Sequence, residues 1–358
     1  MRRSPSIDSV RRKIDQVDEK IIGLLNERAS LALEIGRMKS EREEEVYVAG
    51  REKSILKRLS GLNQGPLSEQ AIRTVYREIL SASRSVEGPI RVAYFGPEAT
   101  FTQMAARERF GGSSVLVAAP SIPDVFQAVE QGRADYGVVP IENSTEGVVG
   151  HTLDRLVETR GTICGEIFLE IHLHLLSRTG RSEEIQRIVS HPQALAQCRE
   201  WLLAHFPNVP TLEVSSTAQA AQMTAGDSTL AAVASSLAGE IYDLKFIEKN
   251  IEDLTNNMTR FFVVGNRSPE PSGEDKTSIV FSVKDEVGIL HQMLEPFAKN
   301  MVNLTKIESR PLKNKPWEYL FFLDLIGHRE EPKVLKALKQ LERKCIFMKV
   351  LGSYPCGA

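Results

Sequence analysis

The stretch NMTRFF, residues 257–262, decides the fold of the middle of this chain. Three other strings precede it in order: GPEATF at 96–101, VPIENSTEG at 139–147 and SHPQA at 190–194. Each string places hydroxyl, amide or charged side chains where an apolar run passes into a helical pattern. In open α/β sheets such strand ends are the usual place for a ligand. The four strings therefore predict one ligand site built from several strand ends.

Apolar runs typical of strands recur between residues 89 and 266, with helical patterns between most of them. The runs are IRVAYFG, YGVVPI, IHLHLL, IQRIVS, LAAVAS and RFFVVG. This alternation is typical of an α/β domain, and we expect a mostly parallel sheet. Ligand binding between two lobes, as in periplasmic binding proteins, fits the same pattern.

Several junctions in this domain carry a helix-capping pattern, in which Glu or Gln follows a polar residue by three positions. They are Asn143 to Glu146, Ser190 to Gln193 and Ser216 to Gln219, with Thr100 and Ser235 as further caps. Capping alone explains any one of them. Together, the free N–H groups of several helix N-termini in one crevice would bind an anion with two carboxylates.

Residues 7–39 carry an apolar stripe whose spacing alternates between three and four, which is a heptad pattern. Its members are Ile7, Val10, Ile14, Val17, Ile21, Leu24, Leu31, Ile35 and Met38. No proline interrupts the stripe, so we expect one long helix that cannot bury its apolar face alone. Shorter helices are expected near 51–60 and 67–86, which makes residues 1–88 an all-α segment.

Three cations lie on or beside this stripe. Arg28 falls on it, and Arg11 and Lys39 each lie one residue past it. Either their stems cover apolar surface at a helix flank, or they bind an anionic ligand inside a helical bundle. Arg11 and Lys39 are 28 residues apart, about 42 Å along a straight helix. They cannot contact one small ligand from a single chain, so a shared site requires an intertwined dimer.

The C-terminal part of the chain has a different sequence pattern. Residues 267–276 are rich in Pro, Ser, Gly and charge, and we expect a linker there. Residues 277–358 then carry strand, helix, strand, strand, helix and strand patterns in that order. This βαββαβ order predicts a ferredoxin-like α+β domain.

Composition excludes several classes of protein. The 358 residues carry a net charge of −2 and are 42% hydrophobic, which predicts a globular protein with no large basic surface for nucleic acid. No apolar run approaches the roughly 20 residues that cross a membrane, and the N-terminus has no apolar signal core, so we expect a cytoplasmic protein. The four cysteines form no CxxC pair, and no metal or organic cofactor is evident.

The helical segment resembles the all-helical chorismate mutases over residues 7–87. The resemblance rests on the cations above, on Arg51-Glu52 and on Ser83 and Glu87. It implies that Arg28 and Lys39, with Arg11 of the partner subunit, hold the two carboxylates and the ether oxygen of chorismate. It also implies that Glu52 takes the substrate hydroxyl and Ser83 a carboxylate, while Arg51 and Val48 line the site.

Glu87 stands where that family often has glutamine. The rearrangement is pericyclic, so catalysis consists of holding a compact conformer and stabilising the breaking C–O bond. A glutamate donates a hydrogen bond to the ether oxygen only when it is protonated. We therefore expect a mutase rate that falls as pH rises through the pKa of Glu87. Val48 also departs from the family, which often has an acidic residue there.

The four strings resemble the prephenate dehydratases over roughly residues 90–265, with the family's TRF string at Thr259-Arg260-Phe261. The resemblance implies that Thr259 contacts the leaving hydroxyl and that Arg260 binds an anion or orders the loop. Further candidate contacts are Thr100, Asn143, Ser144, Gln193, Phe261 and His191. Glu142 is a candidate acid if burial raises its pKa. Ala99 replaces a frequent glycine of GPxGTF, which matters because only glycine takes positive φ at low cost.

The C-terminal domain resembles the ACT regulatory domain of the same enzymes. Gly288-Ile289-Leu290 opens its first helix, and Glu308-Ser309-Arg310-Pro311 is expected to follow its second strand. With Asn303 and Leu304, these residues would form a site for L-phenylalanine between paired domains. Feedback requires the effector to bind two conformations differently.

The whole order resembles the bifunctional chorismate mutase–prephenate dehydratases of phenylalanine biosynthesis, acting as homodimers or larger homo-oligomers. Two alternatives remain at this point. One is an arogenate dehydratase, which performs the same chemistry on an aminated substrate. The other is a catalytically silent phenylalanine or prephenate sensor.

Overall fold

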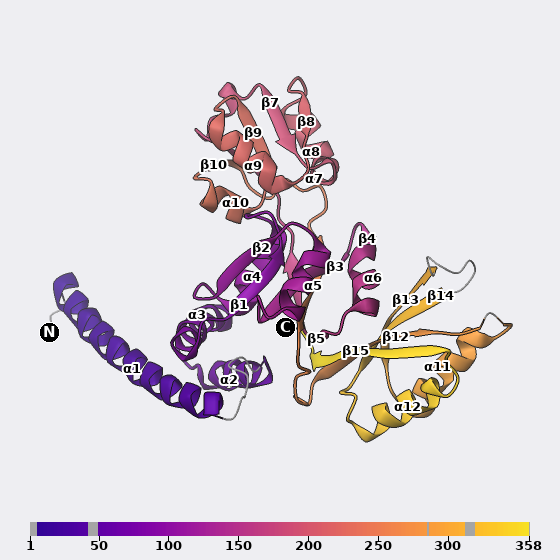
Figure 1. Ribbon diagram of the computed structural model, residues 1–358. Coiled ribbons are helices and arrows are strands. Elements are labelled where there is room, and N and C mark those ends of the chain that lie inside the picture. Colours follow the sequence, from indigo (N-terminus) through magenta and orange to yellow (C-terminus); the bar gives the residue numbers. More distant parts are fainter. Residues whose placement is uncertain (1–5, 42–48, 285, 312–318, 358) are drawn as a thin grey trace. The chain divides into compact units, whose positions relative to one another are not determined.

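The computed structural model in Figure 1 describes residues 6–41, 49–284, 286–311 and 319–357. It divides into two compact units. The first comprises Met1–Ile90 with Phe110–Val115, and the second comprises Arg91–Arg109 with Leu116–Ala358.

The first unit is built from three helices: α1 (Ile7–Glu41), α2 (Ala49–Leu62) and α3 (Glu69–Glu87). Helix α3 packs against both α1 and α2. Ser68 caps α3, because its side chain accepts a hydrogen bond from the backbone N–H of Ala71. Gly36 lets α1 and α3 approach closely, since a Cβ at this position would lie 3.0 Å from Cβ of Glu87. The predicted all-α segment is confirmed.

Helix α1 leaves its apolar stripe largely uncovered in the single chain. Ile7 is 72% exposed and Leu24 is 64% exposed, and Ile14, Leu31 and Met38 are exposed as well. A helix of 35 residues with such a stripe is stabilised by packing far more than by propensity.

The second unit begins with a lobe around a mixed sheet. The sheet has the order β2-β1-β3-β11-β5, and β4 pairs with β3. Its strands are β1 (Arg91–Phe95), β2 (Val115–Ala119), β3 (Tyr136–Asn143), β4 (Gly147–Val148), β5 (Thr162–Glu170) and β11 (Met258–Gly265). Its helices are α4 (Phe101–Phe110), α5 (Ile122–Glu130) and α6 (Gly150–Glu158). Strands β1 and β3 are parallel, whereas β11 runs antiparallel to both β3 and β5.

The second lobe is inserted between β5 and β11. Its sheet has the order β10-β6-β9-β7-β8. The strands are β6 (His174–Ser177), β7 (Arg187–Ser190), β8 (Thr211–Glu213), β9 (Leu230–Ala234) and β10 (Lys245–Glu248). The helices are α7 (Pro192–Gln197), α8 (Arg199–His205), α9 (Thr217–Gly226) and α10 (Ser236–Ile241), with the 3₁₀ turn η1 (Ser182–Glu184).

Two adjacent segments connect this second lobe to the first. The backbone N–H of Ile171 donates to the carbonyl of Asn257 over 2.8 Å, and Ile251 donates to Leu173 over 2.8 Å. The carboxylate of Glu252 accepts from the N–H of Leu173 over 2.9 Å, which joins the two segments a third time. The chain therefore enters and leaves the second lobe at one place.

The prediction of a mostly parallel sheet was wrong. Each lobe has its own mixed sheet, and β6 runs antiparallel to both β9 and β10. The physical reason is topological: the chain returns from the second lobe and places β11 between β3 and β5 in the opposite direction. Strands β2, β4, β5, β8 and β10 were not among the predicted strands.

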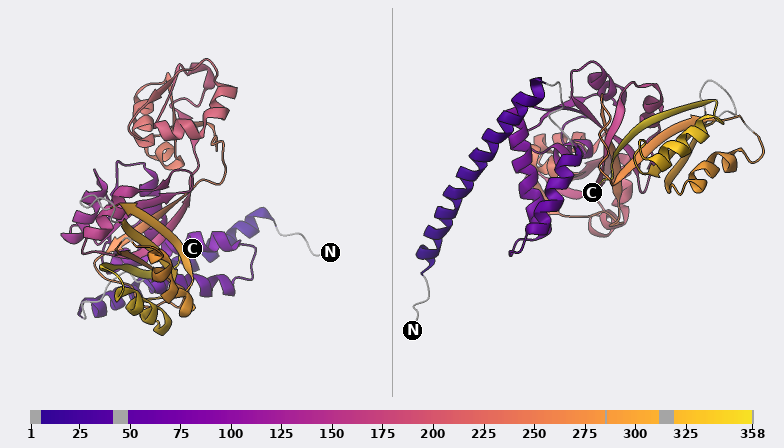
Figure 2. Two further views of the ribbon diagram at one scale, coloured as in Figure 1. Left: turned by 90° about the vertical axis from the view of Figure 1, so that its right-hand side faces the viewer. Right: turned by 90° about the horizontal axis from the view of Figure 1, so that it is seen from below.

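The C-terminal domain has the predicted ferredoxin-like order. Its elements are β12 (Asp275–Ser282), α11 (Ile289–Lys299), β13 (Leu304–Pro311), β14 (Tyr319–Ile326), α12 (Pro332–Glu342) and β15 (Phe347–Pro355). The antiparallel sheet has the order β13-β14-β12-β15. Figures 1 and 2 show α11 and α12 together on one face of it. Strand β12 begins at Asp275, inside the stretch that was predicted to be a linker.

The first lobe and the C-terminal domain share one hydrophobic core. Val139 and Val264 of the first lobe belong to the same buried cluster as Val280, Phe322 and Tyr354 of the C-terminal domain. These two parts of the second unit therefore pack as a continuous body.

Among the helices that the structure describes, none combines the length and the apolar character that a bilayer crossing needs.

Candidate active sites

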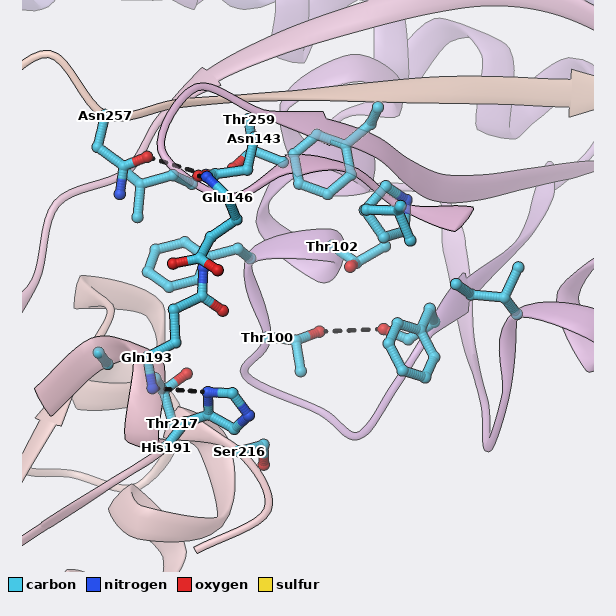
Figure 3. A pocket seen from close by; sticks show the side chains of 18 of the residues that line it. Thr100, Thr102, Asn143, Glu146, His191, Gln193, Ser216, Thr217, Asn257 and Thr259 are labelled. Atoms are coloured by element: carbon cyan, nitrogen blue, oxygen red, sulfur yellow. Dashed lines mark hydrogen bonds between the residues drawn. The ribbon is translucent and has the colours of Figure 1, made fainter. Parts of the chain in front are cut away.

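A pocket of about 570 Å³ lies between the two lobes of the second unit (Figure 3). This volume suits a small organic ligand. The first lobe contributes lining residues from its strand ends and loops, among them Thr100, Thr102, Asn143, Glu146 and Thr259. The second lobe contributes the residues at its helix starts, among them His191, Gln193, Ser216 and Thr217. Figure 3 shows Glu146 and Gln193 extending toward each other from the two lobes.

Thr259 and Asn143 form a hydrogen-bonded pair at the ends of β11 and β3. They are cross-strand partners in the sheet, and Asn143 Nδ2 donates to Thr259 Oγ1 over 2.8 Å. Asn143 Nδ2 also lies 2.9 Å from Asn257 Oδ1, its second acceptor. Because the Thr259 oxygen accepts from Asn143, its own O–H is left to donate to a ligand in the pocket.

The sequence pattern predicted that Asn143 caps a helix, but the structure shows that it does not. Its Oδ1 accepts from the N–H of Thr145 over 3.0 Å and from that of Glu146 over 3.2 Å, which is an Asx turn. Gly147 follows with φ of +80°, so the chain turns back into the short strand β4. Helix α6 begins only at Gly150.

Helix N-termini do converge on the pocket. Thr100 Oγ1 accepts from the N–H of Gln103 at the start of α4, and Ser216 caps α9 by accepting from Gln219. At α7 the cap is His191 rather than Ser190. His191 Nδ1 accepts from the N–H of Gln193 over 3.3 Å, which leaves Nε2 as the protonated donor. Ser190 instead donates to the carbonyl of Val233.

The pocket is poor in charged side chains. Of the lining residues that the structure describes, none is Lys or Arg; Glu146 supplies a carboxylate and His191 an imidazole. An anion in this pocket would therefore meet backbone N–H groups, hydroxyls and amides. This arrangement agrees with the expected role of helix N-termini in anion binding.

Three predicted contact residues lie outside the pocket lining. Side chains alternate along a strand, so Arg260 points to the face opposite Thr259 and Phe261. Arg260 is buried against Glu166 and Asp324. Glu142, the cross-strand partner of Arg260, pairs with Lys306 over 2.5 Å. Both side chains are therefore engaged in ion pairs outside the pocket lining, and their expected substrate contacts stay predictions.

Ser144 is the third of these residues. It is exposed in the turn after β3, and its Oγ accepts from the N–H of Met258 over 3.0 Å. Its hydroxyl joins the turn to β11, and its expected contact with the substrate stays a prediction.

The sequence analysis missed several lining residues. Asn257 Nδ2 donates to Gln197 Oε1 over 3.0 Å, and both line the pocket. Asn257 stood inside the NMTRFF string, and Gln197 lies one helical turn beyond Gln193, on the same face. Asn257 could therefore have been predicted from its string, and Gln197 from its spacing to Gln193.

Ala99 adopts a left-handed backbone with φ of +69° and is fully buried. Its N–H donates to Gln103 Oε1 over 2.6 Å, so the turn that precedes α4 forms without the glycine that the family often has. The replacement leaves the loop in the conformation that glycine favours.

In the first unit, four of the predicted side chains gather between α1 and α3. Arg28 donates through Nη1 to Ser83 Oγ. Lys39 Nζ lies 3.9 Å from Glu87 Oε2. Burial raises the pKa of Glu87 above its usual value, although the charges of Lys39, Arg84 and Arg28 act in the opposite direction.

Glu52 joins this group through a residue that the sequence analysis missed. Its carboxylate lies 2.8 Å from Nη1 of the buried Arg84. Nη2 of Arg84 donates to the carbonyl of Phe110 over 2.6 Å. Arg11 lies exposed near the far end of α1, where it pairs with Asp8 over 3.6 Å. Arg51 is exposed at the start of α2. Val48 lies outside the described residues.

The predicted effector residues fall at two places in the C-terminal domain. Gly288, with φ of +79°, precedes α11, which starts with Ile289 and the exposed Leu290. Asn303 and Leu304 stand at the start of β13. The ESRP string (308–311) lies within β13, not after it as expected.

Arg310 needs a further correction. Its Nη1 lies 3.5 Å from Asp154 Oδ1 on α6, and its guanidinium packs on Gly150. Alternation along β13 directs it to the first lobe.

Metal ligation has no support in these sites. Within the described ranges, no three His, Cys, Asp or Glu side chains come together as metal ligands would.

The fold and the sites define a class of multidomain protein: a helical segment, a two-lobed α/β domain and a ferredoxin-like domain. Residues 10–88 match the family Chorismate mutase type II. Residues 92–269 match Prephenate dehydratase, and residues 277–343 match the ACT domain. The predicted fold class is confirmed.

A relative matches this chain over nearly its whole length. The bifunctional chorismate mutase/prephenate dehydratase of Aquifex aeolicus (strain VF5) is 49% identical over 353 residues, which cover 98% of each chain. The chain therefore belongs to the family of bifunctional chorismate mutase/prephenate dehydratases. The two enzyme classes that the sequence predicted are confirmed by this membership.

Solved structures resemble the second unit. A prephenate dehydratase from Arthrobacter aurescens in complex with L-Phe is 33% identical, with a TM-score of 0.68, and the match covers 74% of this chain and 90% of that chain. GqqA, described as a novel type of quorum quenching acylase, is 30% identical with a TM-score of 0.69, covering 74% of this chain and 98% of that chain.

Proposed function

We propose that this chain carries out two consecutive reactions of L-phenylalanine biosynthesis. The helical segment rearranges chorismate to prephenate, and the pocket between the lobes converts prephenate to phenylpyruvate. Besides the family membership, the observation that carries the second assignment is the Asn143–Thr259 pair. It places an O–H donor, fixed by a 2.8 Å hydrogen bond, at the wall of a pocket of suitable size.

Dehydration breaks two bonds of prephenate. The ring C–O bond breaks as the hydroxyl departs and becomes water on taking up a proton, and the ring carboxylate leaves as CO₂ while the ring becomes aromatic. Thr259 donates a hydrogen bond to the departing oxygen, where negative charge develops. Asn143 fixes the direction of that O–H group, because the Thr259 oxygen accepts from it.

The carboxylates of prephenate bind to helix N-termini. Helices α4 and α9 present their first N–H groups to the pocket, and their caps Thr100 and Ser216 line it. Gln193 and the Nε2–H of His191 add donors from the second lobe. Phe261, which is buried in the pocket lining, gives the ring an apolar contact.

The mutase reaction uses charged side chains instead. Arg28 and Ser83 bind a carboxylate, and Lys39 and the protonated Glu87 donate to the ether oxygen of chorismate as its C–O bond breaks. The 3.9 Å separation of Lys39 Nζ and Glu87 Oε2 supports a shared contact with one atom. Glu52, held by Arg84, takes the substrate hydroxyl.

This mutase site needs a second copy of the chain. Arg11 is exposed and lies 28 residues before Lys39 on α1, so it serves the site only as Arg11 of the partner subunit. The exposed apolar stripe of α1 supports a homodimer. Replacing Leu24 by Glu should dissociate the dimer in sedimentation experiments and abolish mutase activity, while dehydratase activity persists. Loss of mutase activity in an intact dimer would contradict this assignment.

L-Phenylalanine binds the ACT domain and inhibits the dehydratase. The site comprises Gly288, Ile289, Leu290, Asn303 and Leu304, with Ser309 on β13. Glu308 shares the strand face of Arg310, which is directed to the first lobe. The family match of residues 277–343 and the open backbone at Gly288 support this placement. We also retain the prediction of a cytoplasmic enzyme.

One experiment tests both activities. Chorismate is supplied to the purified protein, and chorismate loss and phenylpyruvate formation are followed with and without L-phenylalanine, alongside Thr259→Ala. We expect phenylpyruvate from the wild type and accumulation of prephenate in the variant. A wild type that stops at prephenate would contradict the second assignment, and arogenate would then be the next substrate to test.

A further inference from the structure

Two neighbouring cross-strand pairs of the first lobe face opposite sides of its sheet. Thr259 pairs with Asn143, and Arg260 pairs with Glu142. The first pair includes the groups that line the pocket, and the second contacts the ACT domain. On each strand, the residue at the pocket and the residue that contacts the ACT domain are therefore consecutive.

Arg260 belongs to a buried ionic cluster that spans both domains. Its Nε and Nη2 lie 2.8 and 2.7 Å from Glu166 Oε2 on β5. Its Nη1 lies 2.6 Å from Asp324 Oδ2 on β14 of the ACT domain. Lys276 of β12 lies 2.7 Å from Glu166. Two cations thus balance two carboxylates, which is the condition under which buried charges are tolerated.

Hydrogen bonds from the ACT domain complete this cluster. Ser278 Oγ donates to Asp324 Oδ1 over 2.6 Å, and Arg260 Nη2 donates to the hydroxyl of Tyr354 over 3.2 Å. Burial raises the pKa of Tyr354 far above its usual value, so this hydroxyl keeps its proton. The cavity beside Arg260 and Asp324 measures about 20 Å³, which leaves little space for independent movement.

Glu142 makes a second connection. Its carboxylate lies 2.5 Å from Lys306 Nζ on β13, and this pair is less buried than the cluster around Arg260. β13 and β14 are neighbours in the ACT sheet. Both members of the Arg260–Glu142 pair are therefore held by adjacent strands of the regulatory domain.

We propose that the Arg260–Asp324 and Glu142–Lys306 pairs transmit the state of the ACT domain to Thr259 and Asn143. The proposal rests on the proposed feedback by L-phenylalanine and adds the residues that carry it. An effector that shifts β13 or β14 has to move Lys306 or Asp324. Because ion pairs and close packing hold both contacts, the shift reaches the backbone one residue from each pocket group. The orientation of the Thr259 hydroxyl then differs between the two states.

Two variants test these connections separately: Asp324→Asn for the buried cluster and Lys306→Met for the less buried pair. Binding of L-phenylalanine is measured by calorimetry, and phenylpyruvate formation from prephenate is measured with and without saturating L-phenylalanine. Allosteric coupling typically amounts to about 5- to 150-fold. We expect each variant to bind the effector and to lose most of the inhibition. In Asp324→Asn, saturating L-phenylalanine should lower the rate of phenylpyruvate formation by less than about twofold.

Lys349→Met is the matched control. Lys349 of β15 also joins the ACT domain to the first lobe, but it donates to the carbonyls of Leu156 and Thr159 at the end of α6, over 2.9 and 2.5 Å. It contacts neither β3 nor β11 through these bonds, so its loss should leave the inhibition unchanged.

The outcomes separate this proposal from the function on which it rests. If the wild type makes phenylpyruvate but is not inhibited, the feedback assignment and the path fail together. If the wild type is inhibited and the two variants are inhibited equally, the path alone is wrong. If Lys349→Met also loses the inhibition, then loosening any contact between the ACT domain and the first lobe is enough to abolish it. That result would overturn the proposed path as well. Should Asp324→Asn fail to fold by circular dichroism, Lys306→Met decides.

Discussion

The two proposed sites of this chain would bind similar dianionic ligands in opposite ways. Between α1 and α3, the site consists of charged side chains: Arg28, Lys39 and Glu87, with Arg84 beside them. Between the two lobes, the described lining contains neither Lys nor Arg and relies on backbone N–H groups, hydroxyls and amides. One site depends on charge, and the other depends on backbone geometry.

The difference follows from what each reaction does to its carboxylates. In the rearrangement both carboxylates survive, and negative charge develops on the ether oxygen, so fixed cations favour the transition state. In the dehydration one carboxylate departs as neutral CO₂. A cation paired with that carboxylate would stabilise the substrate more than the transition state and slow the reaction. A site of neutral donors avoids this effect.

The largest expected effect is at Arg28. Arg28→Ala removes a fixed cation from the mutase site, and chorismate turnover should fall about 10²- to 10³-fold. Prephenate turnover by the same protein should stay within twofold of the wild type, roughly, because the pocket does not use this charge. A parallel loss of dehydratase activity would show that the two sites are not independent.

Thr259→Ala should lower the dehydratase kcat about 10²-fold, because the donor to the leaving oxygen is lost. Thr259→Ser keeps the hydroxyl and should recover most of the rate. Thr255→Ala, in the exposed turn before β11, serves as the control. Equal rates for the alanine and serine variants would show that the hydroxyl has no role in this reaction.

The protonation of Glu87 makes the charged site sensitive to pH. Burial raises the pKa of Glu87, and the protonated, donating form predominates below that pKa. The mutase rate should therefore be highest at low pH and fall about tenfold per unit above the raised pKa. Glu87→Gln donates at every pH and should remove this fall while leaving the dehydratase profile unchanged. Superimposable mutase profiles for the two proteins would refute the assignment.

Among these tests, a change in salt concentration should give the smallest difference between the two sites. Dissolved ions screen interactions between charged groups, so raising NaCl from about 0.05 to 0.5 M should raise the KM for chorismate about two- to fivefold. The KM for prephenate should change less, because the described lining of its pocket contains no Lys or Arg. Equal salt dependence of the two KM values would show that charges outside both sites dominate.

Local sequence patterns were sufficient to predict much of this molecule. The heptad stripe predicted α1, and the βαββαβ order predicted the ACT fold, because both depend on periodicity within one segment. The four strings correctly predicted that Thr100, Asn143, Gln193 and Thr259 lie at one pocket. These residues lie near strand ends of the two lobes, and strand ends are the usual ligand site in open α/β folds.

What the sequence did not predict depends on contacts between distant segments. Nothing near Arg260 shows that Asp324 and Glu166 will surround it, although strand alternation alone would have separated it from Thr259. Arg84 was missed because its partners Glu52 and the carbonyl of Phe110 come from other elements. The Asx turn at Asn143 was mistaken for a helix cap because both use the same residue types.

The order of the first sheet has a consequence for synthesis on the ribosome. β11 lies between β3 and β5 but is made only after the inserted second lobe, residues 171–257. At roughly 5–20 residues per second, these 87 residues take about 4–17 s. During that time β3 and β5 each present an open edge, which invites pairing with other chains. Thr259 arrives with the strand that closes this gap, so its hydroxyl reaches the pocket only when β11 has joined β3 to β5.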